Sequence, residues 1–171
     1  GVVYRIGDDT ALNFYKHYLG EDIFRGESGA IAEYPLAVYE DDGESFYLRS
    51  AIFLDRETGS LTFVGNVPEG STVQIAHSTR NKIVEAAEQS IRASVQGYPG
   101  IEPLAALCFS CGSRKQVLGT RVEEEYLAFR NSFPDLPVAG FYTYGEIAPL
   151  MRDRPARFHN ETFVNVVMGL K

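Results

Sequence analysis

The sequence predicts an α/β (α+β) fold in which two long helices and one short helix cover a mixed, largely antiparallel sheet. Three observations support this class. Strand-like runs follow one another between residues 34 and 76 with short turns between them, which is typical of antiparallel pairing. Apolar residues recur at helical spacing in residues 80–95 and 120–133. The order strand, helix, strand over residues 103–140 also requires at least one parallel pair of strands.

The short helix is expected at residues 11–19. Leu12, Tyr15 and Leu19 fall at helical spacing there. The polar residues up to Thr10 can cap the first turn, and Gly20 is typical of the position just after a helix. The following residues, 23–33, have no clear period, so they predict a loop or a frayed extra turn.

The expected strands are short runs rich in β-branched and aromatic residues, each bounded by turn residues. They cover residues 2–6, 34–39, 45–54, 60–64, 72–76, 103–109, 138–144 and 161–168. Residues 45–54 alternate with apolar side chains on both faces, which favours one central strand. The long helix at 80–95 is expected to begin at a Ser78 or Thr79 cap. Residues 97–102 read as a connector.

The composition of the chain argues against several classes of function. The chain has 171 residues with a net charge of −7, and we expect one domain over residues 1–171. The acidic balance argues against a nucleic-acid partner and against a polybasic membrane contact. No apolar run approaches the roughly 20 residues of a membrane span. Two cysteines in a chain of this size indicate a reducing compartment.

Four polar side chains lie close together in sequence near the carboxyl end of the strand at 138–144, and these are Tyr142, Tyr144, Glu146 and His159. Gly145 would let the backbone turn where this strand ends. Polar groups at a strand end point into the space where α/β folds bind ligands. The same residues could equally serve packing, with the tyrosine hydroxyls bonded at the edge of the core.

Cys108 and Cys111 have the spacing C-x-x-C. Cys108 lies inside an apolar run, so we expect it to be buried and inert. A structural zinc site needs two such pairs, and the sequence has no second one. Attachment of a c-type haem is excluded because Gly112, not histidine, follows the second cysteine. Cys111 leaves the strand close to Arg114, which could lower its pKa. It is therefore either a reactive thiol or a small wall residue.

Several motifs together resemble the C-terminal part of the FIST domain. They are the segment 109–114 with Leu118-Gly119, residues 140–149 (GFYTYGEIAP), residues 158–162 (FHNET), Arg49-Ser50, residues 59–61 (GSL) and residues 67–70 (VPEG). The resemblance extends over essentially the whole chain. Cys108 and residues 23–33 are not features of the family pattern.

The resemblance implies a cytoplasmic, ligand-sensing module of signal-transduction proteins. Such modules are proposed to bind small ligands such as amino acids, and some members are haem-containing nitric-oxide sensors. The implied partners are a small-molecule ligand, the N-terminal part of the FIST domain, which we expect this chain to lack, and a signalling output domain or protein. We expect no cofactor and no metal. The positions that match the family motifs are Cys111, Arg114, Tyr142, Gly145, Glu146, His159 and Asn160.

The leading hypothesis is a non-enzymatic sensor of an amino-acid-like ligand. Arg114 would clamp its carboxylate, and Glu146 would meet its ammonium group. Tyr142 or Tyr144 would form a wall of the pocket. We expect Cys111 and Glu146 at the same end of the sheet, because strands joined by one right-handed crossover run in parallel.

Three alternatives remain open. The chain could be a thiol-dependent enzyme with Cys111 as nucleophile, His159 as base, and Asn160 or Glu146 orienting the imidazole. It could be a haem-binding nitric-oxide sensor that uses His159 as the axial ligand. It could also be an interaction module whose aromatic residues are buried against the missing N-terminal part.

Overall fold

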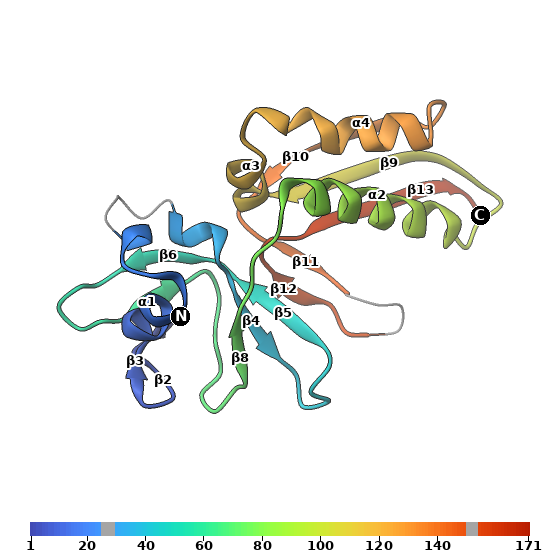
Figure 1. Cartoon of the computed structure of the whole chain (residues 1–171). Coiled ribbons are helices and arrows are strands. Elements are labelled where there is room, and N and C mark those ends of the chain that lie inside the picture. The colour runs from blue at the N-terminus through green and yellow to red at the C-terminus, as the bar shows by residue number, and fades with distance from the viewer. Residues whose placement is uncertain (25–29, 150–153) are drawn as a thin grey trace. The chain divides into compact units, whose positions relative to one another are not determined.

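A computed structural model describes residues 1–24, 30–149 and 154–171. Its mixture of helices and mostly antiparallel sheets confirms the α+β class (Figure 1). The chain divides into two compact units. The first contains residues 1–77 and 158–160, and the second contains residues 78–157 and 161–171. None of the described helices has the length and apolar character that a membrane span requires.

Over its described residues, the first unit contains one α-helix, two 3-10 helices and three small antiparallel sheets. Its helix α1 (Ala11–Leu19) confirms the short helix, with the Thr10 hydroxyl accepting from the Asn13 amide at 3.2 Å. Two sheets have three strands, in the orders β1-β7-β6 and β5-β4-β8, and the third pairs β2 with β3. The elements are β1 (Val2–Val3), β2 (Arg5–Ile6), β3 (Asp9–Thr10), η1 (Asp22–Phe24), η2 (Ala30–Glu33), β4 (Leu36–Tyr39), β5 (Phe46–Arg49), β6 (Ala51–Leu54), β7 (Leu61–Phe63) and β8 (Val73–Ile75).

Two strand predictions are wrong in this unit. Residues 2–6 form two strands in different sheets, and residues 45–54 divide at Ser50 into β5 and β6. At this break the Ser50 amide donates to the Asn160 side-chain oxygen at 3.4 Å. A pattern with two apolar faces suits one central strand or two successive strands equally well, so the alternation could not reveal the break. Residues 23–33 form 3-10 turns where described, and residues 25–29 lie outside the described residues.

The first unit has its own core around α1. Tyr15 is buried at its centre and donates its hydroxyl to the Tyr34 carbonyl at 3.1 Å. Burial holds the pKa of the Tyr15 phenol well above its ordinary value. The core also includes Leu12, Phe24, Ile31, Leu36, Leu61 and Phe63.

The second unit has a three-stranded sheet in the order β10-β9-β13. The register places Cys111 of β9 beside Thr143 of β10 in a parallel pair, which confirms the predicted parallel arrangement. β13 is antiparallel to β9. The elements are α2 (Arg80–Gln96), β9 (Glu102–Cys111), α3 (Gly112–Leu118), η3 (Gly119–Arg121), α4 (Glu123–Ser132), β10 (Val138–Thr143), β11 (Glu146–Ala148) and β13 (Phe163–Leu170). The short strand β12 (Arg157–His159) passes from the second unit into the first.

The two long helices, α2 and α4, pack against one face of this sheet (Figure 1). Ile91 of α2, Ala106 of β9 and Phe129 of α4 meet in a shared core. The Thr79 hydroxyl caps α2, as the sequence predicts, by accepting from the Lys82 amide at 3.3 Å. The ring of Phe141 lies on the opposite face and is 67% exposed.

Helix α3 was not predicted, because Gly112 and Ser113 at its start look like a loop. The residues that mark it as a helix are Arg114 and Leu118, which are four positions apart and both buried. The last strand was predicted from residue 161 but begins at Phe163. Glu161 has a φ of 62°, a left-handed conformation that cannot continue a strand.

Candidate functional site

The eight predicted site residues fall in two different units. Cys111, Arg114 and the segment 142–146 belong to the second unit. His159 and Asn160 belong to the first. The two groups are therefore described separately.

The side chain of Arg114 is buried and is already bound to a carboxylate of the protein. Its Nη2 lies 2.6 Å from Glu125 Oε1, and its Nε donates to the same oxygen at 2.9 Å. Nη2 also donates to the Ile83 carbonyl at 3.0 Å, and Nη1 donates to the Glu161 carbonyl at 3.5 Å. The guanidinium therefore links α3 to α2, to α4 and to Glu161, which precedes the last strand.

Glu125 connects this ion pair to the sheet. It is only 3% exposed. Its second oxygen, Oε2, accepts hydrogen bonds from Ser110 Oγ at 2.9 Å and from Tyr142 Oη at 3.2 Å. Burial first, and then the neighbouring Glu125 carboxylate, raise the pKa of Tyr142 to about 12. Arg114 and Tyr142, which the sequence singled out, thus meet at a residue that it did not.

Sequence reasoning missed Glu125 and Ser110. Glu125 stands in a run of three glutamates that looks solvated. However, it precedes Phe129 by four positions, which places it on the buried face of α4. That spacing was the available signal. Ser110 lies two positions after Cys108 along β9, so both side chains point to the same, helix-covered face of the sheet.

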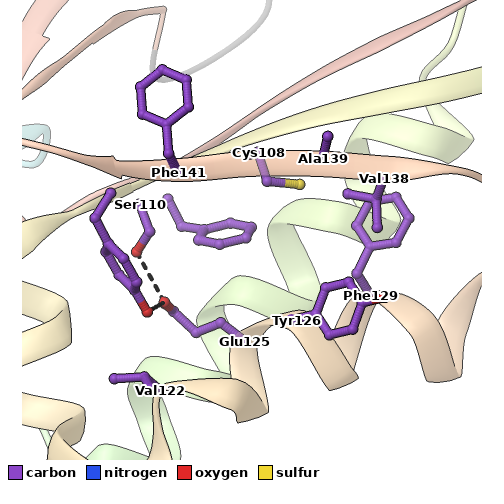
Figure 2. A pocket seen from close by; sticks show the side chains of 12 residues that line it. Cys108, Ser110, Val122, Glu125, Tyr126, Phe129, Val138, Ala139 and Phe141 are labelled. Carbon is purple, nitrogen blue, oxygen red and sulfur yellow. Dashed lines mark hydrogen bonds between the residues drawn. The ribbon is translucent and has the colours of Figure 1, made fainter.

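A cavity of about 440 Å³ opens beside this network, between α4 and the strands β9 and β10. Figure 2 shows Cys108, Ser110 and Glu125 on the α4 side of the sheet, whereas the ring of Phe141 points away. The cavity wall is mostly apolar, with the hydrogen bonds between Ser110, Tyr142 and Glu125 at one end. Its apolar lining includes Val122, Phe129, Val138 and Phe163.

Glu146, the first residue of β11, is a second buried carboxylate. It is 4% exposed. It accepts hydrogen bonds from the hydroxyl of Thr143 and from Thr162 Oγ1, the latter at 2.6 Å. These hydroxyls hold the oxygens that the prediction assigned to a ligand's ammonium group. Gly145 has a φ of 155°, and Tyr144 is 96% exposed, so its phenol points into solvent.

Both cysteines are free thiols. Burial raises the pKa of Cys111; backbone hydrogen bonds from Glu161 and Ser113 oppose this in part, and the carboxylates of Glu146 and Glu161 add to it slightly. This direction is opposite to the lowering that Arg114 was expected to cause. Cys108 donates to Asn165 Oδ1 at 3.1 Å, and burial followed by Glu125 raises its pKa to about 11. Neither thiol therefore has the lowered pKa of an activated nucleophile.

His159 and Asn160 are buried in the first unit. The Asn160 amide nitrogen donates to the His159 carbonyl at 3.2 Å, while its oxygen accepts from the Ser50 amide. Arg49 donates a hydrogen bond to the carbonyl of Phe158, the residue before His159, at 3.1 Å. Among the residues that the structure describes, no cluster of three or more histidine, cysteine, aspartate or glutamate side chains is placed to hold a metal ion.

Residues 11–149 match the family model described as the FIST C domain. No curated protein and no solved structure matches the chain.

Proposed function

The chain belongs to the FIST C domain family, a family of sensory modules in signal transduction, and from this premise we propose that its second unit binds a small ligand in the cavity beside Glu125. The observation that carries the proposal is the form of that cavity. Small-molecule sites are mostly apolar hollows of about 300–1,000 Å³ with a few polar groups that fix orientation. A cavity of about 440 Å³ with its polar network at one end has this form.

The arrangement also suggests how binding would be reported. Tyr142 of β10, Ser110 of β9 and Glu125 of α4 meet at the cavity, and Arg114 continues the network to α2 and α3. A ligand that changes any of these hydrogen bonds changes how the helices are held on the sheet. The proposed receivers of this signal are the N-terminal part of the FIST domain and an output domain or protein.

An amino-acid-like ligand held by Arg114 and Glu146 remains a prediction. For that ligand, Arg114 would have to give up its bonds to Glu125, and Glu146 would have to give up two hydroxyl donors. Removing a partner from a buried ion pair costs about 3–5 kcal/mol. The cavity requires no such exchange, so we propose it as the binding site.

The test is a thermal-shift screen of the purified chain with a broad panel of small molecules that includes amino acids. Val122→Phe would fill part of the cavity, and Leu127→Phe, at an exposed position of α4, the helix that follows Val122, is the matched control. We expect compounds that raise the melting temperature of the parent and the control to lose this effect with Val122→Phe. Compounds that act equally on all three proteins, or a panel without any active compound, would contradict the proposal.

A further inference from the structure

The hydrogen-bond capacity of Glu125 is used up inside the protein. A carboxylate has about four acceptor positions, two on each oxygen. Arg114 supplies two donors to Oε1, at 2.9 and 2.6 Å. Ser110 and Tyr142 supply one donor each to Oε2, at 2.9 and 3.2 Å. A ligand in the cavity therefore finds no vacant acceptor position on this carboxylate.

The hydroxyl groups around Glu125 have a fixed direction for the same reason. Ser110 and Tyr142 each have one O–H, and an ionised carboxylate can only accept, so both protons point at Glu125. The lone pairs of the two hydroxyl oxygens remain for a ligand. The thiol of Cys108 is likewise directed to Asn165 Oδ1. The polar side chains at this end of the cavity can therefore only accept hydrogen bonds from a ligand, so a ligand that binds there must carry an N–H or O–H donor.

The charge of the cavity also favours a neutral ligand. The Arg114–Glu125 pair cancels, so the cavity presents no net charge to a ligand. Lys115 Nζ lies 5.3 Å from the centre of the Tyr142 ring but is not among the cavity-lining residues. A carboxylate or a zwitterion would lose its hydration in an apolar cavity without gaining a charged partner, which is unfavourable.

We propose that the cavity takes a neutral aromatic molecule that carries one N–H or O–H donor, of the indole or phenol type, and excludes carboxylates and zwitterions. The aromatic body would lie against Val122, Phe129 and Phe163, and the donor would meet the oxygens of Ser110 and Tyr142. This inference rests on the proposed function, because it names the ligand class of the same site.

Indole, N-methylindole and indole-3-acetate are suitable probes. The second probe has no N–H donor, and the third adds a carboxylate. The chain contains no tryptophan, so the fluorescence of a bound indole can be followed without a tryptophan background from the protein. We expect indole to bind at least about tenfold more tightly than N-methylindole, which corresponds to ~1.4 kcal/mol and to one good hydrogen bond. We expect indole-3-acetate to bind more weakly than indole.

Variants of Tyr142 and Ser110 identify the groups that cause the preference for indole over N-methylindole. Tyr142→Phe should reduce the preference for indole, and Tyr142→Phe combined with Ser110→Ala should bring the ratio of the two affinities close to one. Binding of N-methylindole should be retained in both variants, which shows that the cavity is intact. Tyr144→Phe is the matched control, because that phenol lies in solvent and its loss should leave the ratio unchanged.

The possible results separate the ligand class from the proposed function. Equal binding of indole and N-methylindole, or tighter binding of indole-3-acetate, overturns the ligand class while the cavity remains a binding site. The same holds if indole fails to bind but another compound of the screen binds and is blocked by Val122→Phe. If binding of indole itself is unaffected by Val122→Phe, both the location and the class are wrong.

Discussion

Arg114 and Glu125 form a buried ion pair in which Nη2 and Oε1 lie 2.6 Å apart, with both side chains less than one-tenth exposed. The pair joins two helices that are adjacent in sequence, α3 and α4, at the point where they meet the sheet. It also sets the direction of the hydroxyl groups at the end of the cavity. Its loss should therefore affect both the stability of the second unit and its ligand preference.

Removing one member of this pair should be strongly destabilising. Glu125→Leu leaves the guanidinium of Arg114 buried without its carboxylate, and such changes cost about 3–5 kcal/mol. The double change Arg114→Met with Glu125→Leu removes both charges and should cost less than either single change. Urea unfolding of the two single variants and the double variant measures the difference. A double variant less stable than both single variants would contradict this reading.

Gly140 should tolerate no side chain. A Cβ atom there would lie 1.9 Å from the Cys108 carbonyl oxygen of the neighbouring strand. Because the obstacle is backbone, Gly140→Ala should reduce the free energy of unfolding by at least about 2 kcal/mol, as for other overpacked positions. Gly112→Ala is the control, since a Cβ there would meet only the Thr143 carbonyl at 3.4 Å. Similar stability of the two variants would show that β10 can move away from β9.

Cys111 should react slowly with alkylating reagents in the native protein. Burial raises the pKa of its thiol, and the thiolate is the reactive form. We expect little modification by iodoacetamide at neutral pH and complete modification after denaturation, measured by mass spectrometry of the peptides. Native alkylation faster than that of the denatured chain would instead support the thiol-dependent enzyme that the sequence left open.

Stability should fall under alkaline conditions. The pKa of Cys108 rises from an ordinary value of 9.0 to about 11 in the folded protein. Between these values the unfolded thiol has lost its proton while the folded thiol keeps it, so the unfolded state is favoured. The pKa of Tyr142 likewise rises from 10.0 to about 12 in the folded protein, so its ionisation also favours the unfolded state in that range. The stability present below pH 9 should therefore decrease as the pH rises through this range.

Urea titrations at several pH values measure this decrease. Cys108→Ala should make the fall between pH 9 and 11 shallower, and Tyr142→Phe should do so between pH 10 and 12. Tyr144→Phe serves as the exposed control and should leave the profile unchanged. A profile that stays the same in both test variants would rule out these two groups as its cause.

Asn160→Ala should loosen the first unit at Ser50. The substitution removes the oxygen that accepts from the Ser50 amide and the nitrogen that donates to the His159 carbonyl. Buried groups left without such a partner cost about 1–3 kcal/mol each. Hydrogen exchange should show faster exchange of the Ser50 amide, with little change in the sheet of the second unit. Unchanged exchange at Ser50 would show that this hydrogen bond is unimportant.

Local chemistry accounts for what the sequence could predict. The Thr10 cap and the helical spacing of residues 80–95 depend on neighbours in sequence, and the parallel pair follows from the order of successive elements. The strand break at Ser50 coincides with a hydrogen bond to Asn160, which is 110 positions away. The buried role of Glu125 depends on Arg114 reaching it from a helix that the sequence did not reveal. The hydrogen bond between Ser50 and Asn160 leaves no periodic signal, whereas the spacing of Glu125 and Phe129 does place Glu125 on the buried face of α4.

The placement of residues 158–160 in the first unit has a consequence during protein synthesis. The body of that unit ends at residue 77, and the segment that contacts Arg49 and Ser50 follows about 80 residues later. At roughly 5–20 residues per second, a ribosome takes about 4–16 s to produce the intervening chain. During this time, the first unit lacks residues 158–160, which have not yet been synthesised.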